Sequence, residues 1–187
     1  RDALAGALDR ARARFGALHG ALHSAVAMAD RSIRHLDSGH FEHVYAAKAE
    51  GSRLLAELTA GDDLDVLALF SSVLTLQGNA GQANYVAACA YQDALAERLH
   101  SQGRRALSIG WGYWGEVGAV ADPHHAQLLS EQGIPPIRIA EAEAGFAAAL
   151  ASGRPRVVVA RLSQARRASM AWNAPADEGA AEGDAAA

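Results

Sequence analysis

The sequence contains one set of side chains, Lys48, Ser72 and Tyr85, whose chemistry could be combined in a single site. A lysine ammonium beside a tyrosine hydroxyl stabilises tyrosinate and lowers the tyrosine pKa from about 10 toward working pH. Such a tyrosine can donate a proton to a carbonyl oxygen as hydride reaches the carbon. A serine hydroxyl can hold that oxygen in place. The spacing alone does not establish such a site, because many α/β proteins contain these residues by chance.

Two of these residues lie where a predicted strand ends and the next helix begins. Residues 64–72 (LDVLALFSS) are apolar on both faces, as expected for a central parallel strand that ends at Ser72. Residues 73–84 contain two glycines and two asparagines, which predict a loop. Tyr85 then lies in the first turns of a helix predicted over residues 82–100. The loop allows the helix to fold back, so that both hydroxyls face one cleft.

Lys48 lies on the preceding helix, one of four helices that alternate with four strands along the chain. The helices are predicted at residues 2–15, 38–58, 82–100 and 141–151, and the strands at residues 18–27, 64–72, 106–110 and 156–160. This alternation predicts an α/β fold in which right-handed βαβ units form a parallel sheet with helices on both faces. Ligands of such sheets bind beyond the carboxyl ends of the strands. The positions to inspect are therefore Ser71, Ser72 and the loop after Gly110.

Composition excludes several classes of protein. The 187 residues carry a net charge of −4, and half of them are hydrophobic, as in a globular domain with a sizeable core. Lys48 is the only lysine among 17 basic residues, and the single cysteine, Cys89, excludes a disulfide framework or a cysteine-based zinc site. The mild acidity argues against a sequence-independent nucleic-acid binder. No metal site is expected, because His35, His40 and His43 have no convincing fourth ligand nearby.

The chain ends carry further expectations. No apolar run approaches the roughly 20 residues that cross a bilayer, and the first residues lack the apolar segment of a signal peptide. We therefore expect a cytoplasmic protein with no membrane partner, cut from a longer protein because no Met begins it. From about residue 174 the chain has no large apolar side chain whose burial could offset its ordering entropy. The sequence therefore predicts one domain over residues 1–162 and a flexible linker or tail over residues 163–187.

Longer stretches of the sequence resemble a known family. The segments FSSVLTLQGNAGQANYVAACAYQD (70–93) and SIGWGYWG (108–115) are similar to the ketoreductase domain of modular polyketide synthases, a branch of the short-chain dehydrogenase/reductases. The segments HSAVAMADRS (23–32) and AAKAEGS (46–52) match the same family in order and spacing. The segment WGYWGEVGAVA (111–121) resembles ketoreductases of synthases whose acyltransferase acts in trans.

The resemblance implies an activity and a role for each residue. The implied reaction is NADPH-dependent reduction of a β-keto acyl thioester, carried on an acyl carrier protein, to the β-hydroxy thioester. Other polyketide synthase domains are the implied partners. Tyr85 matches the family's proton donor, Ser72 its carbonyl-binding serine and Lys48 its catalytic lysine. The implied cofactor-binding residues are Ser24, Lys48, Tyr85, Trp111 and Gly112.

One part of the family's cofactor site has no counterpart in the sequence. The nucleotide site of the family begins with a glycine-rich turn that holds the pyrophosphate at a helix N-terminus. This chain has no G-x-G-x-x-G motif, and its first strand matches a mid-sheet strand of the family. We therefore expect a partial Rossmann-type fold, in which the N-terminal nucleotide-binding strands are missing and an apolar sheet edge is exposed. The fragment alone is expected to be inactive.

Two other readings of the sequence remain open. The first is a catalytically silent, reductase-like scaffold domain of the synthase. It is favoured by Cys89, where the family usually has asparagine, and by Val26, where a glycine usually lies close to the cofactor. The second is a free-standing short-chain dehydrogenase for small alcohols. It is disfavoured because such enzymes carry a lysine four residues after the tyrosine, at the position of Cys89.

Overall fold

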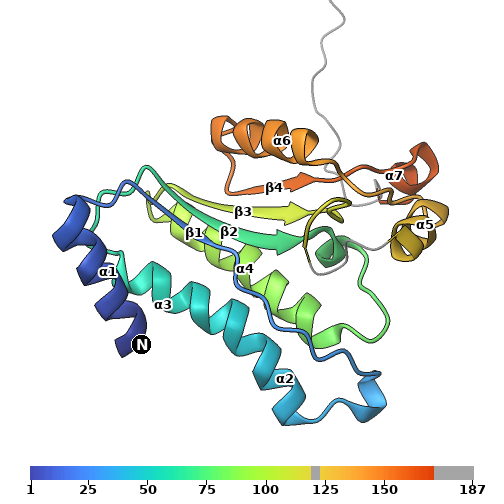
Figure 1. The fold of residues 1–187 in the computed structure, drawn as a ribbon, viewed down its shortest axis with the longest axis horizontal. Coiled ribbons are helices and arrows are strands. Elements are labelled where there is room, and N and C mark those ends of the chain that lie inside the picture. Colours follow the sequence, from blue (N-terminus) through green and yellow to red (C-terminus); the bar gives the residue numbers. More distant parts are fainter. Residues whose placement is uncertain (119–122, 171–187) are drawn as a thin grey trace, which may run out of the picture.

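Four parallel strands form the centre of the structure, in the order in which they follow one another along the chain (Figure 1). The structure is a computed structural model that describes residues 1–118 and 123–170. Each strand runs parallel to its neighbours, which confirms the predicted parallel sheet. The strands are β1 (Gly20–His23), β2 (Val66–Ser72), β3 (Ala106–Trp111) and β4 (Arg156–Val159).

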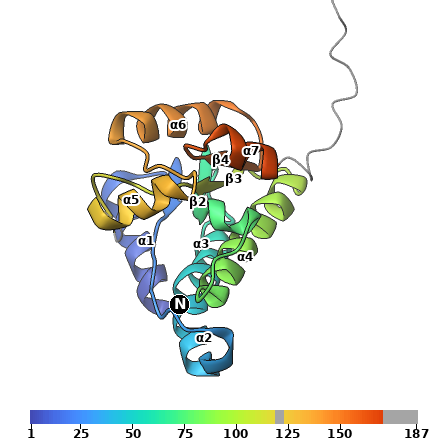
Figure 2. The ribbon, with the colours of Figure 1, turned by 90° about the vertical axis from the view of Figure 1, so that its right-hand side faces the viewer.

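Helices surround the sheet, with α6 on one side and α3 and α4 on the other (Figures 1 and 2). Of the helices in the described residues, none is both long and apolar enough to cross a membrane. The α-helices are α1 (Asp2–Phe15), α2 (Ser38–Tyr45), α3 (Gly51–Leu58), α4 (Ala83–Ser101), α5 (Pro123–Glu131), α6 (Ile139–Ala151) and α7 (Gln164–Met170). The other helical segments are the 3-10 helices η1 (Ile33–His35) and η3 (Val73–Leu76) and the π-helical segment η2 (Ala46–Glu50).

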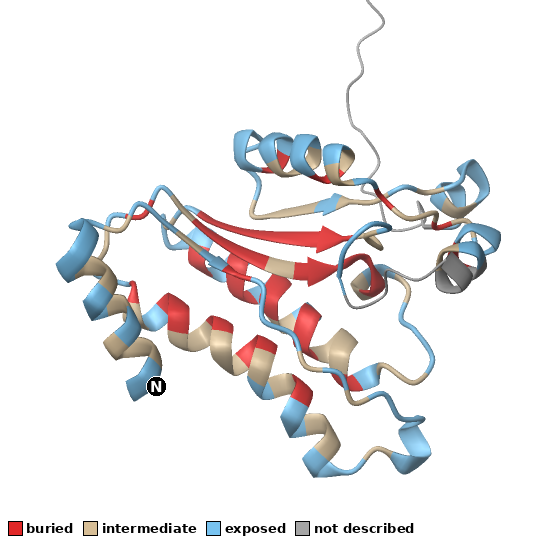
Figure 3. Cartoon of the chain, in the orientation of Figure 1, coloured by how far each residue is buried: buried red, intermediate tan, exposed pale blue. Residues whose placement is uncertain are grey.

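The core has two apolar clusters on opposite faces of the sheet, because successive strand residues point to opposite sides. On one face, Leu67 and Leu69 of β2 pack with buried residues of α3 and α4. On the other face, Leu107 and Ile109 of β3 pack with α6 residues such as Ala142. The buried residues are concentrated on β2, on β3 and on the helix faces turned toward them (Figure 3). The predicted α/β fold with helices on both faces is therefore confirmed.

The first strand is shorter than the predicted strand at residues 18–27. β1 pairs with β2 only from Gly20 to His23 and forms one edge of the sheet that the structure describes. After His23 the chain no longer pairs with β2, and the strand ends there. Leu22 on β1 is 53 % exposed, and Val26, which follows it, is 49 % exposed. An apolar sheet edge is thus exposed in this chain, as expected from its sequence.

The helix predicted over residues 38–58 is confirmed as an uninterrupted helical run of α2, η2 and α3. Lys48 lies in the middle of this run, inside the π-helical segment. Such segments are often found at functional sites. The region after Ser72, for which a loop was expected, instead begins with η3. Some backbone N–H groups of the region after Ser72 therefore find hydrogen-bond acceptors within this short helix.

The C-terminal region departs from a simple tail in the part that the structure describes. Helix α7 lies within residues 163–187, the segment predicted as a linker. The backbone N–H of Ser163 donates to the carbonyl oxygen of Gly133 (2.8 Å), and Arg166 of α7 donates to Gln77. The remaining residues of that segment, 171–187, lie outside the described residues. The domain boundary at residue 162 stays a prediction.

Gly145 allows α6 to approach β4 closely. A Cβ atom at this position would lie 2.4 Å from Val159 Cγ1, so alanine must push the helix away from the strand. We expect Gly145→Ala to lower the free energy of unfolding by about 1–3 kcal/mol, although alanine favours helix interiors. Gly6→Ala in α1 is the matched control, because its Cβ would meet only Arg10 Nη1, at 3.5 Å. Urea denaturation compares the two variants, and an unchanged midpoint for Gly145→Ala would contradict the expectation.

Candidate active site

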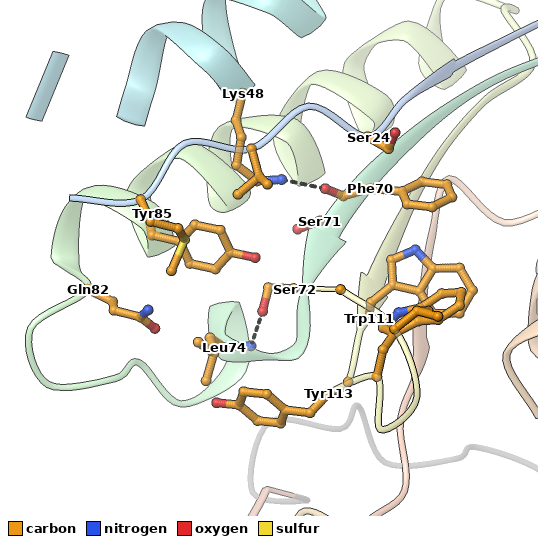
Figure 4. A pocket seen from close by; sticks show the side chains of 16 residues that line it. Ser24, Lys48, Phe70, Ser71, Ser72, Leu74, Gln82, Tyr85, Trp111 and Tyr113 are labelled. Carbon is orange, nitrogen blue, oxygen red and sulfur yellow. Dashed lines mark hydrogen bonds between the residues drawn. The ribbon is translucent and has the colours of Figure 1, made fainter. Parts of the chain in front are cut away.

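The residues that the sequence singled out line one cavity of about 290 Å³ beyond the carboxyl ends of the strands (Figure 4). The sheet register explains part of this convergence, because Ser72 at the end of β2 is paired with Trp111 at the end of β3. Helix α4 and segment η2 bring the other two catalytic candidates to the same edge. The predicted residues in the lining are Ser24, Lys48, Ser72, Tyr85, Trp111 and Gly112.

Lys48 is a buried cation at this site, with 3 % of its surface exposed. Its Nζ donates a hydrogen bond to the backbone carbonyl oxygen of Phe70 (2.7 Å) and lies 5.5 Å from the ring centroid of Tyr85. Burial lowers the pKa of Lys48, and electrostatic interactions with the neighbouring Cys89 and Asp93 oppose that effect in part. The ammonium is therefore held against the end of β2, directly above the tyrosine ring.

Ser72 is held at the start of η3, where it acts as the N-cap residue. Its Oγ accepts a hydrogen bond from the backbone N–H of Leu74 (3.2 Å). This bond uses one lone pair of the hydroxyl oxygen and leaves the hydroxyl hydrogen able to donate toward the cavity. The fixed oxygen and the donating hydrogen suit a residue that holds a carbonyl oxygen.

Tyr85 lies in the first turn of α4, and its hydroxyl points toward Ser72 (Figure 4). Burial raises the pKa of Tyr85 well above its ordinary value, Cys89 raises it further, and a hydrogen bond with Ser72 lowers it in part. The sequence suggested the opposite direction, a pKa lowered by lysine. The structure differs because burial has the largest effect on the pKa of Tyr85, and Lys48 gives its hydrogen bond to Phe70 rather than to the phenol. Tyr85 is thus a protonated phenol, the form that donates a proton.

The two residues that favour the scaffold reading take different places. Val26 lines the cavity. Cys89 is fully buried, one turn of α4 after Tyr85, and its carbonyl oxygen accepts a hydrogen bond from Ser71 Oγ (3.2 Å). Burial raises the pKa of the Cys89 thiol, while Lys48 lowers it in part. Cys89 therefore packs as a small buried thiol behind the cavity wall.

An aromatic wall of the cavity was only partly anticipated. The ring centroid of Trp111 lies 5.4 Å from that of Phe70 and 5.1 Å from that of Trp114. Tyr113 and Gln82 also line the cavity, although neither was assigned a role from its sequence context. The signal for Tyr113 was available, because the run WGYW begins at the last residue of β3 and continues beyond the end of the strand. Gln82 gave no comparable signal, since its place depends on how the loop before α4 folds back.

Two of the three histidines considered for a metal site make local contacts. Nδ1 of His40 lies 2.7 Å from Asp37 Oδ1, at the start of α2, and Asp37 caps that helix. His35 contacts Ser32 through a similar local pair. Among residues 1–118 and 123–170, no group of three or more His, Cys, Asp or Glu side chains could hold a metal ion.

The geometry defines a class of protein. The parallel α/β sheet, with a cavity beyond the carboxyl ends of its strands, is a partial Rossmann-type fold like that of the short-chain dehydrogenase/reductases. The KR domain family model matches residues 1–116, which is more than half of the chain. The chain therefore belongs to the KR domain family, the ketoreductase domains of modular polyketide synthases. The resemblance drawn from the sequence motifs is confirmed.

Individual relatives share sequence and fold with this chain. It is 41 % identical over 127 residues to polyketide synthase ThaG of Burkholderia thailandensis, which covers 67 % of this chain and 2 % of ThaG. It is 42 % identical over 149 residues to polyketide synthase GfsE of Streptomyces halstedii, which covers 78 % of this chain and 4 % of GfsE. A solved A-type ketoreductase from a modular polyketide synthase matches with a TM-score of 0.80 at 33 % identity. That match covers 92 % of this chain and 38 % of the solved chain, so the chain spans a small part of each relative.

Proposed function

We propose that this chain supplies the carbonyl-reducing site of a ketoreductase that converts a β-keto acyl thioester, bound to an acyl carrier protein, to the β-hydroxy thioester. The observation that carries the proposal is the convergence of Lys48, Ser72 and Tyr85 in one cavity at the strand ends. Membership of the KR domain family supports a reductase of polyketide biosynthesis. The carrier protein and the other synthase domains are the proposed partners, and a synthase with acyltransferase in trans remains a prediction.

The three side chains divide the work at the carbonyl group. The Ser72 hydroxyl donates a hydrogen bond to the substrate carbonyl oxygen and holds it near Tyr85. The Tyr85 hydroxyl gives its proton to that oxygen, so the alcohol forms and a tyrosinate remains. The Lys48 ammonium, 5.5 Å from the ring centroid, stabilises this tyrosinate until a proton returns. When bound, NADPH supplies the hydride to the carbonyl carbon.

The residues present fit the nicotinamide end of the cofactor. The cavity, at about 290 Å³, is near the lower limit of ligand pockets and holds only part of a dinucleotide. We propose that Ser24, Trp111 and Gly112 contact the cofactor beside Lys48 and Tyr85. Gly112 has no room for a side chain, since a Cβ atom there would lie 3.0 Å from Ala160. This position therefore presents bare backbone at the cavity wall.

The polypeptide of residues 1–187 should bind NADPH poorly when it is produced by itself. The sequence has no glycine-rich turn at a helix N-terminus, so the backbone amides that hold the pyrophosphate of such cofactors are missing from this polypeptide. We expect a calorimetric titration with NADPH to show no saturation. The full-length native polypeptide, titrated in parallel, is the control. Tight, saturable binding by residues 1–187 alone would overturn this expectation.

Activity of the full-length native polypeptide tests the proposed function directly. It is incubated with NADPH and a β-keto thioester on an acyl carrier protein, and the β-hydroxy product is identified by mass spectrometry. We expect product formation matched by loss of NADPH absorbance. Folded protein that forms no product would favour the silent scaffold. A Cys89→Asn variant that then gained turnover would assign the silence to the buried thiol beside Tyr85.

A further inference from the structure

We propose that Thr75 and Arg156 are positioning residues, which hold Ser72 in register with Tyr85 through a partly buried chain of polar contacts. The inference rests on the proposed function, in which the two hydroxyls act on one carbonyl oxygen. The chain of contacts runs from η3 through β4 to α4. It connects the loop that carries the serine to the helix that carries the tyrosine.

The first link fixes both oxygens of Ser72. Thr75 Oγ1 donates a hydrogen bond to the Ser72 carbonyl oxygen (3.0 Å), and Ser72 Oγ accepts one from the Leu74 N–H (3.2 Å). The backbone carbonyl and the side chain of one residue are thus held by the same short turn. Because η3 has only four residues, it has little rigidity of its own. Its orientation depends on what Thr75 contacts next.

The second link is Arg156, the first residue of β4. Its Nη2 donates to Thr75 Oγ1 (3.1 Å), and its Nε forms an ion pair with Asp93 Oδ2 (3.1 Å). The planar guanidinium therefore reaches two partners with two different nitrogens, which a lysine ammonium could not do in the same geometry. The Nε–Oδ2 contact is an ion pair rather than an aligned hydrogen bond.

The third link anchors the ion pair in the core. Asp93 is 4 % exposed, and its Oδ1 accepts a hydrogen bond from Ser108 Oγ (2.6 Å), a fully buried residue of β3. A buried carboxylate needs such partners, because an unpaired buried charge is costly. Asp93 follows Tyr85 by eight residues on α4, which brings it back to the same side of the helix. The ion pair therefore links the tyrosine helix to the serine turn.

A second threonine provides a matched control. Thr59 Oγ1 donates to the Leu55 carbonyl oxygen (2.7 Å) and lies 3.4 Å from Arg104 Nη2, so it has the same kinds of partner as Thr75. Thr59 is fully buried and does not line the active-site cavity. Thr59→Val and Thr75→Val thus remove equivalent contacts at different places. If turnover differs between the two variants, the difference comes from the place of the lost contacts in the fold and not from a general loss of stability.

The experiment compares Thr75→Val, Thr59→Val and Ser72→Ala in the full-length native polypeptide. We expect Thr75→Val to lower kcat about 10-fold with KM nearly unchanged, because small displacements of reacting groups are costly. Thr59→Val should stay within about 2-fold of wild type. Ser72→Ala should cost about 100-fold, and adding Thr75→Val to it should cost nothing further. Arg156→Met should match Thr75→Val, and Arg156→Lys should recover part of the loss.

Several results would overturn the inference. Additive effects of Thr75→Val and Ser72→Ala would show that Thr75 does not act through the serine. Equal losses of kcat for Thr75→Val and Thr59→Val would show that Thr75 affects turnover only through the stability of the fold. Hydrogen exchange at the Leu74 amide gives a readout without turnover, and Thr75→Val should speed it about 10-fold. If the wild-type polypeptide proved unable to reduce the thioester, the proposed function would fail, while unchanged Leu74 exchange in Thr75→Val would separately refute the positioning role.

Discussion

Replacing Tyr85 by phenylalanine should lower kcat for thioester reduction by about 100- to 10,000-fold, the range attributed to general acid catalysis. The variant loses the phenol proton that reaches the carbonyl oxygen and keeps the ring beneath Lys48. The fold should be retained, because only one oxygen atom is removed. NADPH affinity should change little, since the ring still shapes the cavity wall. Steady-state kinetics and a cofactor titration on the full-length native polypeptide measure both quantities.

Two other tyrosines serve as controls for this experiment. Tyr91→Phe changes a partly buried phenol on the same helix, outside the cavity lining, and should leave kcat within about 2-fold of wild type. Tyr113→Phe removes the other phenol that lines the cavity. If turnover survived Tyr85→Phe and disappeared with Tyr113→Phe, the proton donor would have to be reassigned to Tyr113.

The pH dependence of the tyrosine tests the same site. Burial raises the pKa of Tyr85, so the phenol should keep its proton beyond pH 10, the ordinary pKa of tyrosine. Ultraviolet titration of wild type and Tyr85→Phe should therefore differ only above that pH. A tyrosinate signal near neutrality that vanished in the variant would mean that stabilisation of the tyrosinate by Lys48 outweighs the effect of burial on the tyrosine pKa.

Replacing Lys48 should produce the second large effect. We expect Lys48→Met to lower kcat by about 100- to 1,000-fold, because no cation remains to stabilise the tyrosinate. The free energy of unfolding should stay within about 1 kcal/mol of wild type, since methionine buries the same volume without the cost of a buried charge. Activity and stability are thus expected to separate. Steady-state kinetics and urea denaturation on the same preparation measure kcat and the free energy of unfolding. A fall in both quantities together would indicate a structural role for Lys48.

Arginine should not rescue the site, although the chain uses arginine for every other basic position. The broad, planar guanidinium cannot occupy the place of a compact ammonium that lies over a ring and donates to the Phe70 carbonyl oxygen. We expect Lys48→Arg to lose nearly as much turnover as Lys48→Met. Arg53→Lys changes a partly exposed ion-pair residue on α3; it is the matched control and should leave turnover unchanged. Full activity of Lys48→Arg would reduce the role of Lys48 to charge alone.

The alkaline stability of these variants has a defined sign. Burial lowers the pKa of Lys48 below its ordinary value of 10.5, so the unfolded chain binds this proton more tightly than the folded chain does. Between the lowered pKa and 10.5, raising the pH therefore stabilises the wild type relative to Lys48→Met. The stability difference between them, measured by denaturation at several pH values, should shift in favour of the wild type as the pH rises through this window.

Much of the architecture could be predicted from local patterns. The apolar run over residues 64–72 predicted a strand buried on both faces, and β2 packs against helices on each side because of it. The alternation of helices and strands predicted the parallel sheet, and parallel strands bring their carboxyl ends to one edge. The motifs around Ser72 and Tyr85 predicted the family. These features depend on residues close together in the chain, where spacing and side-chain type carry the information.

Other features depend on contacts between distant segments, so the sequence alone did not determine them. The ion pair of Arg156 with Asp93 and its contact with Thr75 exist only because β4, α4 and η3 meet. The direction of the Tyr85 pKa likewise depends on burial and on where the Lys48 ammonium lies. The sequence by itself determined the fold class and which lysine, serine and tyrosine meet. Only the tertiary structure decided how they are oriented and held. Burial and long-range hydrogen bonds depend on segments far apart in the chain and leave no periodic pattern of residues in the sequence.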